Sequence, residues 1–103
     1  MSALRELLDA QGPQIRQKVE KIVSRHGKDR ATALNEICHV LHLPTAVYKM
    51  EEKGRRFGST VFVYSFVGEI LASAMSNWAQ SKTAARRNAA AVLLLGLGLI
   101  KRF

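Results

Sequence analysis

Apolar residues recur at helical spacing in the first part of the chain, in two stretches separated by a break. A leucine stripe over residues 4–8 forms the first stretch, and Gly12-Pro13 ends it because these residues interrupt a helix. Proline is well tolerated at the first position of a helix, so Pro13 is expected to begin the second one. The apolar positions of the second stretch fall at i, i+4, i+7 and i+8: Ile15, Val19, Ile22 and Val23. The pattern predicts two short helices, and Gly27 ends the second.

Residues 31–42 show helical spacing again, with a clear division into two faces, and Pro44 stops the pattern. The apolar face consists of Leu34, Ile37, Cys38 and Leu41. The opposite face consists of Thr32, Asn35, Glu36 and His39. Because residues three and four apart share one side of a helix, we expect a helix that buries one face and presents a row of polar groups on the other.

Three segments have the composition of β-strands, namely residues 47–52, 61–67 and 70–75. Residues 51–58 are polar and contain two glycines, so we interpret them as the loop between the first two strands. Gly68-Glu69 then makes a tight connection into the third strand. Short links of this kind predict an antiparallel meander.

The second strand carries an alternation of aromatic and smaller residues. The aromatic positions are Phe62, Tyr64 and Phe66, and the intervening ones are Val61, Val63, Ser65 and Val67. If the valines face the helices, the aromatic side chains line the open face of the sheet. An exposed row of three aromatic residues requires a cover, which we expect from the N-terminal helices or from a second chain.

The last element is a helix over residues 82–95, capped by Ser81 and ended by Gly96 and Gly98. It is basic at its start and apolar afterwards. The order of elements predicts an α+β fold in which two helices cover one face of a three-stranded antiparallel sheet. We expect residues 1–30 to form a helical extension and residues 31–103 to form the main domain.

The net charge of the chain limits the kinds of molecule that it is expected to bind. Sixteen Lys and Arg residues against eight Asp and Glu give a net charge of +8, which favours a polyanion such as nucleic acid or an acidic membrane surface. The longest apolar run, residues 89–100, is shorter than the roughly 18 residues that a membrane span requires. The single cysteine, Cys38, permits no internal disulfide and indicates an intracellular, nuclear or cytoplasmic location.

Several segments together resemble the double-stranded RNA-binding domain family. They are residues 34–39 (Leu-Asn-Glu-Ile-Cys-His), Leu43-Pro44, Tyr48, the Gly54 loop and residues 81–91 (Ser-Lys-Thr-Ala-Ala-Arg-Arg-Asn-Ala-Ala-Ala). The last stretch is the most specific, because the family opens its second helix with a Ser-Lys-Lys-x-Ala-Lys pattern. The resemblance covers residues 31–97. It implies that the first helix and the loop between the first two strands enter minor grooves, while the start of the second helix contacts phosphates.

The resemblance also implies which residues of this chain contact RNA. They are Thr32, Asn35, Glu36 and His39 on the first helix, Arg55 and Arg56 in the loop, and Lys82, Thr83, Arg86 and Arg87 on the second helix. The sequence departs from the family at three places. Thr83 stands where the family has a second lysine, residues 54–57 lack the proline and histidine of its Gly-Pro-x-His loop, and residues 77–80 lack its glycines.

The resemblance implies a non-catalytic module that binds double-stranded RNA by its A-form shape. The alternative is an interaction module of the same fold, which forms a homodimer or docks on a larger RNA-processing protein. Peripheral membrane binding through the basic N-terminal helix is a third class, but we expect no membrane partner. We expect no catalysis and no cofactor, because no nucleophile set is visible and His39 and His42 lack further metal ligands.

Two smaller questions stay open at this level. Trp78 either closes the end of the sheet or forms an exposed contact. The N-terminal helices are expected to be structural and to cover the aromatic row. The opposite assignment would rest on the basic residues of the second helix, which would extend the phosphate contacts: Arg16, Lys18, Lys21 and Arg25.

Overall fold

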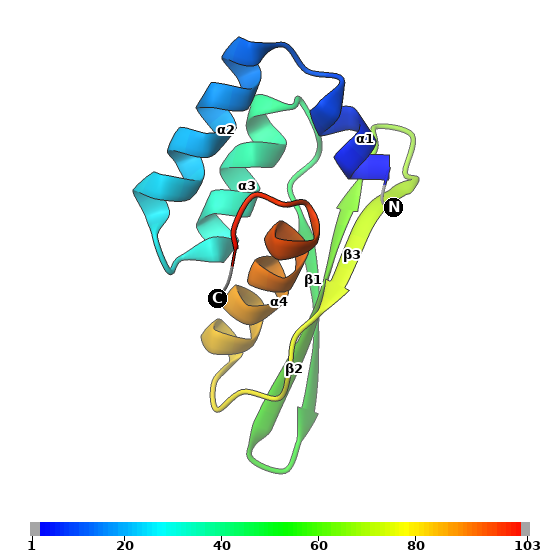
Figure 1. Ribbon diagram of the computed structural model, residues 1–103. Helices are drawn as coiled ribbons and strands as arrows, with labels where there is room; N and C mark the ends of the chain where they lie inside the picture. Colours follow the sequence, from blue (N-terminus) through cyan, green and yellow to red (C-terminus); the bar gives the residue numbers. More distant parts are fainter. Residues whose placement is uncertain (1–2, 102–103) are drawn as a thin grey trace.

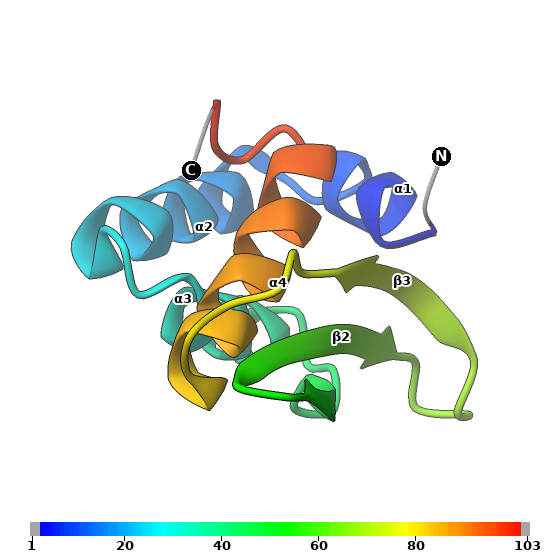
Figure 2. The ribbon, with the colours of Figure 1, turned by 90° about the horizontal axis from the view of Figure 1, so that it is seen from below.

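The computed structural model describes residues 3–101; Met1, Ser2, Arg102 and Phe103 lie outside the described residues. The elements are α1 (Ala3–Asp9), α2 (Pro13–His26), α3 (Arg30–Val40), β1 (Val47–Lys53), β2 (Arg56–Tyr64), β3 (Ile70–Met75) and α4 (Lys82–Gly96). The strands form one antiparallel sheet in the order β1-β2-β3, and the helices lie on one side of it (Figures 1 and 2). The predicted α+β class is therefore confirmed.

The interior of the protein lies between α4, the sheet and α3. Helix α4 packs on β2 and β3 and also against α3. Its alanines Ala85, Ala89 and Ala90 are fully buried, because a small side chain allows two elements to approach closely. Val61 and Val63 of β2 face the helices and are also fully buried, as the alternation predicted. One continuous core extends from α1 to the segment that follows α4.

The N-terminal helices form where the sequence predicted them, but they cover a different surface. Val19, Ile22 and Val23 of α2 are buried, and α2 packs against α3. Helix α1 lies against β3 on the helical side of the sheet (Figure 2). The expectation that these helices cover the aromatic row on the open sheet face is therefore wrong. The apolar stripe of α2 instead finds its partner on α3, and α2 lies farther from the sheet than α3 and α4 (Figure 2).

The first two strands form a longer hairpin than the sequence predicted. Their pairing continues to the end, where Lys53 lies opposite Arg56, and only Gly54 and Arg55 form the turn. The expected polar loop over residues 51–58 is therefore wrong. Backbone hydrogen bonds hold the ladder whether or not its side chains are apolar, and Gly54 supplies the positive φ (+63°) that a tight hairpin turn needs.

The second strand ends at Tyr64, three residues earlier than predicted. Phe66 and Val67 lie in the turn before β3 and are 75% and 81% exposed. The aromatic row thus contains only Phe62 and Tyr64, whose ring centroids lie 6.1 Å apart on the open face. The Nζ atom of Lys49 lies 5.4 Å from the centroid of Phe62, so a charged side chain covers part of this row.

Candidate nucleic-acid interface

The start of α3 is fixed by an N-cap that involves one of the predicted site residues. The carboxylate of Asp29 accepts hydrogen bonds from the backbone N–H of Thr32 (3.3 Å) and from the Thr32 hydroxyl (2.8 Å). These bonds, chiefly the one from the hydroxyl, hold the pKa of Asp29 below its usual value. Thr32 is exposed, but its hydroxyl proton is already donated. It therefore offers only an acceptor to a ligand.

The middle of the α3 face is engaged with α2. Glu36 is half-buried, and its Oε2 atom lies 2.7 Å from Nε2 of His26 and 4.0 Å from Nη1 of Arg25. The Oδ1 atom of Asn35 is buried and has no hydrogen-bond partner among the residues that the structure describes. His39 is exposed and lies two turns further along the helix than Thr32. The predicted polar face exists, and part of it is shared with α2.

The start of α4 presents the predicted basic residues to solvent. Ser81 is the N-cap, and its hydroxyl accepts a hydrogen bond from the N–H of Ala84 at 3.0 Å. The four predicted residues of the first turns are all exposed: Lys82, Thr83, Arg86 and Arg87. Free N–H groups and the positive end of the helix dipole add to the attraction of these cations for an anion.

Among these cations, Arg87 also connects α4 to α3. The Nε atom of Arg87 lies 3.8 Å from Oδ1 of Asp29, so the start of α4 is tied to the start of α3. Both side chains are about half exposed, and a pair of this kind contributes about 0–1 kcal/mol. Arg87 therefore helps to set the position of α4 relative to α3, in addition to its place on the predicted surface.

The hairpin is connected to α4 as well, through residues 76–80, which lie between β3 and α4. Phe57 and Ala79 form an isolated β-bridge with reciprocal backbone hydrogen bonds of 2.8 and 2.7 Å. The Nζ atom of Lys82 lies 6.0 Å from the centroid of the Phe57 ring. Residues 76–80 are thus attached to β2, and they hold the start of α4 beside the hairpin.

Trp78 combines the two roles that the sequence left open. A Cβ atom on Gly58 would lie 3.3 Å from the indole ring, so one side of the ring packs on the β2 backbone. The residue nevertheless remains 46% exposed. It lines a shallow pocket together with Lys53 and Arg56. Arg56 belongs to β2, and Arg55 occupies the turn.

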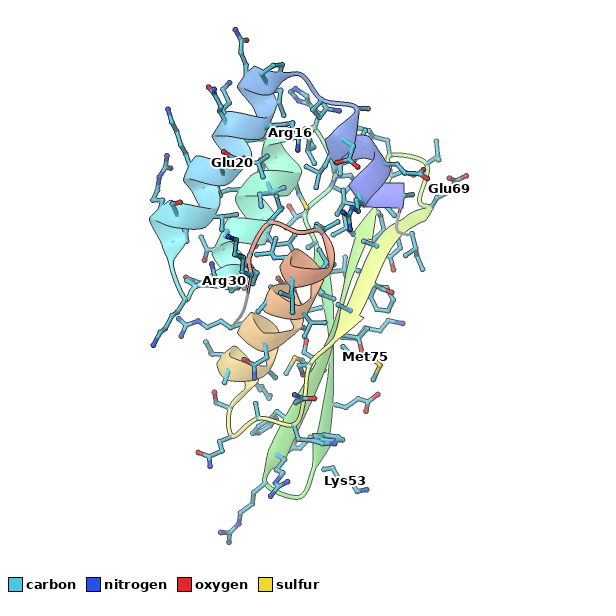
Figure 3. All side chains as sticks on the ribbon, viewed as in Figure 1. Arg16, Glu20, Arg30, Lys53, Glu69 and Met75 are labelled. Atoms are coloured by element: carbon cyan, nitrogen blue, oxygen red, sulfur yellow. The ribbon has the colours of Figure 1, made fainter. Side chains whose placement is uncertain are left out.

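The three predicted surfaces lie along one side of the molecule. The start of α3, the start of α4 and the β1–β2 hairpin follow one another at the lower part of Figure 1. Lys53 marks the hairpin end in Figure 3, and Glu69 lies at the opposite end of the sheet. Within the predicted set, all residues except Asn35 and Glu36 are exposed.

Sequence reasoning left the basic side chains of α2 out of the predicted site and named them only in the alternative assignment. Lys18, Lys21 and Arg25 line a groove of about 440 Å³ between α2 and α3, and Glu36 and His39 form its other wall. The signal was visible as a basic amphipathic helix. The sequence does not reveal which element the apolar stripe of α2 packs against. Because the structure shows that this element is α3, it also shows that the cations of α2 lie beside the α3 face.

Two titratable groups of the protein interior, the Tyr48 phenol and the Cys38 thiol, have raised pKa values. Burial raises the pKa of the Tyr48 phenol to about 12, and the Asp29 carboxylate and the Cys38 thiolate that forms in alkali add to the shift. Burial likewise raises the pKa of the Cys38 thiol to about 11. Both groups are therefore uncharged near neutral pH, and Cys38 is a packing residue rather than a reactive thiol.

No model of a known protein family matches the chain, and a search of curated proteins finds no match. In residues 3–101, no helix has both the length and the apolar character needed to cross a membrane. Within the same residues, no group of three His, Cys, Asp or Glu side chains is placed to hold a metal ion.

Proposed function

We propose that this protein is a non-catalytic module that binds double-stranded RNA in the manner of the double-stranded RNA-binding domain family. The observation that carries the proposal is the position of the α4 start. Its exposed cations stand between the α3 face and the β1–β2 hairpin, with a direct connection to each. Three contact surfaces in a fixed order fit a ligand that is long, regular and anionic.

The chemistry of each surface suits one part of an A-form duplex. Lys82 and Arg86 lie four residues apart on one side of α4, where they can contact phosphates across the narrow major groove. The polar face of α3 offers donors and acceptors to 2′-hydroxyl groups in a minor groove. Arg55 and Arg56 at the end of the hairpin are then available for the next minor groove.

Fluorescence anisotropy with an RNA duplex of about 20 base pairs and a DNA duplex of the same sequence tests this function. We expect the RNA to bind at least tenfold more tightly. Equal affinities for RNA and DNA would reduce the interaction to charge attraction and would contradict the proposal.

The double variant Lys82→Gln/Arg86→Gln locates the site. We expect it to bind the RNA duplex at least tenfold more weakly, with a salt dependence that is flatter by about one to two units of slope. Arg16→Gln/Lys49→Gln is the matched control, because it removes the same charge from positions away from the three surfaces. An equal loss of affinity in the control would show that net charge alone is responsible.

The open face of the sheet favours a second candidate function, an interaction module that forms a homodimer or docks on a larger RNA-processing protein. Val47, Ile70 and Met75 are 44%, 56% and 66% exposed, and Phe62 and Tyr64 lie between them in the strand register. Sedimentation at increasing concentration separates the two functions. A dimer that Met75→Glu dissociates, in a protein without affinity for RNA, would select the second one.

A further inference from the structure

The groove between α2 and α3 brings the basic face of the N-terminal extension to the α3 surface. Lys18, Lys21 and Arg25 form one wall, and they follow one another at spacings of three and four residues along α2. They therefore share one side of the helix and span about 10 Å along its axis. Glu36 and His39 form the opposite wall, and both belong to the α3 face described above.

The charge of this groove is positive in spite of its carboxylate. Glu36 is already paired with His26 at 2.7 Å and lies 4.0 Å from Arg25. The two lysines have no such partner among the ion pairs that the structure gives for the described residues. A ligand that enters the groove thus meets ammonium groups on the α2 wall, and the Glu36 carboxylate on the other wall is paired with His26. Phosphate groups fit this arrangement.

We propose that α2 is part of the RNA site, with Lys18, Lys21 and Arg25 binding backbone phosphates beyond the α3 face. This inference rests on the proposed function and extends it. The duplex would then contact the protein from the hairpin, across the start of α4 and along α3, onto α2. The lower end of α2 lies beside the start of α3 in Figure 1, on the same side of the molecule as the other surfaces.

The position of the apolar stripe is what allows this second role. Val19, Ile22 and Val23 are buried against α3, so α2 is held as a rigid neighbour of the α3 face. The backbone that carries the cations is therefore held at a fixed position beside the α3 face, so binding does not have to order this helix. One helix with two faces is therefore compatible both with the expected structural role and with a role in RNA binding.

The double variant Lys18→Gln/Lys21→Gln tests the inference. We expect about a tenfold weaker affinity for an RNA duplex of about 24 base pairs and a salt dependence flatter by about one to two units. The variant should also gain less than the wild type when the duplex is lengthened from about 16 to about 24 base pairs, because the phosphates beyond α3 lose their partners. Both lysines are exposed, and a thermal melt by circular dichroism checks that the variant is folded.

The matched control is again Arg16→Gln/Lys49→Gln. Arg16 belongs to the same helix but lies beside Asp9 and Leu97, away from the groove, and Lys49 lies on the open sheet face. We expect the control to bind within twofold of the wild type. A loss in the control as large as that in Lys18→Gln/Lys21→Gln would overturn the inference, because net charge would explain both.

The remaining outcomes separate this inference from the proposed function. If Lys18→Gln/Lys21→Gln binds like the wild type while Lys82→Gln/Arg86→Gln loses affinity, α2 lies outside the site and the proposed function stands. If the wild type itself fails to bind the RNA duplex, both are overturned. Polyglutamate that competes as well as the duplex would also overturn the inference, since the groove would then accept any polyanion.

Discussion

The Nε2 atom of His26 lies 2.7 Å from Oε2 of Glu36, and this contact joins the last turn of α2 to the middle of α3. Glu36 is also a residue that the sequence predicted to contact RNA. In the proposed complex, one carboxylate would thus have two partners, the histidine within the protein and a 2′-hydroxyl of the RNA. Because a carboxylate has several acceptor sites, it can accept from both at once.

Glu36 is the first position where this arrangement can be tested. We expect Glu36→Gln to retain RNA affinity within threefold, because its amide still offers an oxygen acceptor and one repulsive charge near the phosphates is removed. Glu36→Ala loses the contact with His26 and should lower the free energy of unfolding by about 1 kcal/mol or less, as for a partly exposed pair. Anisotropy and urea denaturation measure the two effects. A similar loss of RNA affinity in both variants, with unchanged stability, would show that the ionised carboxylate itself binds the RNA.

Asp29 supports the start of α3 and is expected to give a pH-dependent contribution to stability. Asp29→Ala removes the cap for Thr32 and should cost about 0.5–2 kcal/mol at pH 7. The pKa of Asp29 is lower in the folded state, so this contribution is present above its ordinary value of 3.8 and is lost as the pH falls through the folded value.

Urea denaturation at pH 7 and at pH 2.5 measures the difference between wild type and Asp29→Ala. We expect this difference to be smaller in acid. Asp29→Asn is the control variant, because an amide oxygen retains the capping acceptor while the pairing with Arg87 is lost. A difference that is the same at both pH values would assign the effect to helix propensity alone.

Cys38 predicts the opposite behaviour in alkali. The folded chain holds the thiol proton up to a pKa of about 11, whereas the unfolded chain releases it near 9.0. Between these values the unfolded state binds fewer protons, so the free energy of unfolding falls as the pH rises. The slope attributable to one group is at most about 1.4 kcal/mol per pH unit.

Urea denaturation between pH 8 and pH 11 should therefore show a shallower decline for Cys38→Ala than for the wild type. The remaining decline above pH 10 is expected to come in part from Tyr48, whose pKa is raised to about 12. Identical slopes for the two proteins would contradict this assignment. In the native wild type near neutral pH, a thiol reagent should label Cys38 far more slowly than in the unfolded protein.

Gly58 tests the attachment of the segment before α4. Gly58→Val places a branched side chain where even a Cβ atom would lie 3.3 Å from the Trp78 ring, so the indole must move. We expect Trp78 emission to shift to longer wavelength and RNA affinity to fall severalfold, because the start of α4 loses its support. Trp78 is the only tryptophan in the chain, so the signal is unambiguous. Gly96→Ala is the control, since nothing lies within 4 Å of its added Cβ. An unchanged emission in Gly58→Val would mean that the ring is held by other contacts.

The parts of the fold that the sequence predicted well are those with local signals at both ends. Strand β3 begins and ends at the expected residues, 70 and 75, and α4 begins after the Ser81 cap as expected. The hairpin was predicted less well, because backbone pairing over residues 51–58 leaves no apolar alternation to detect. Its side chains extend beyond the core that the helices cover.

The neighbours of each helix could not be predicted, because an amphipathic stripe does not identify the surface it meets. In α3, Ala33 and Val40 lie beside Ile37 and make the apolar face wider than the sequence suggested, and α2 packs on that helix. The pairing of Asp29 with Arg87 depends in the same way on how α3 and α4 cross. The candidate residues were visible in the sequence, whereas their engagement with one another required the fold.

If the protein binds a duplex by shape, as we propose, the bridge between Phe57 and Ala79 has a mechanical consequence. Its two backbone hydrogen bonds prevent the hairpin from swinging away from the start of α4. The distance between the cations of the hairpin and those at the start of α4 is thereby fixed when the protein folds. A duplex with differently spaced grooves could contact both groups of cations only if it bent or if the two backbone hydrogen bonds broke. The preference for one helical form of the nucleic acid would then come from the rigidity of this part of the protein rather than from contacts with bases.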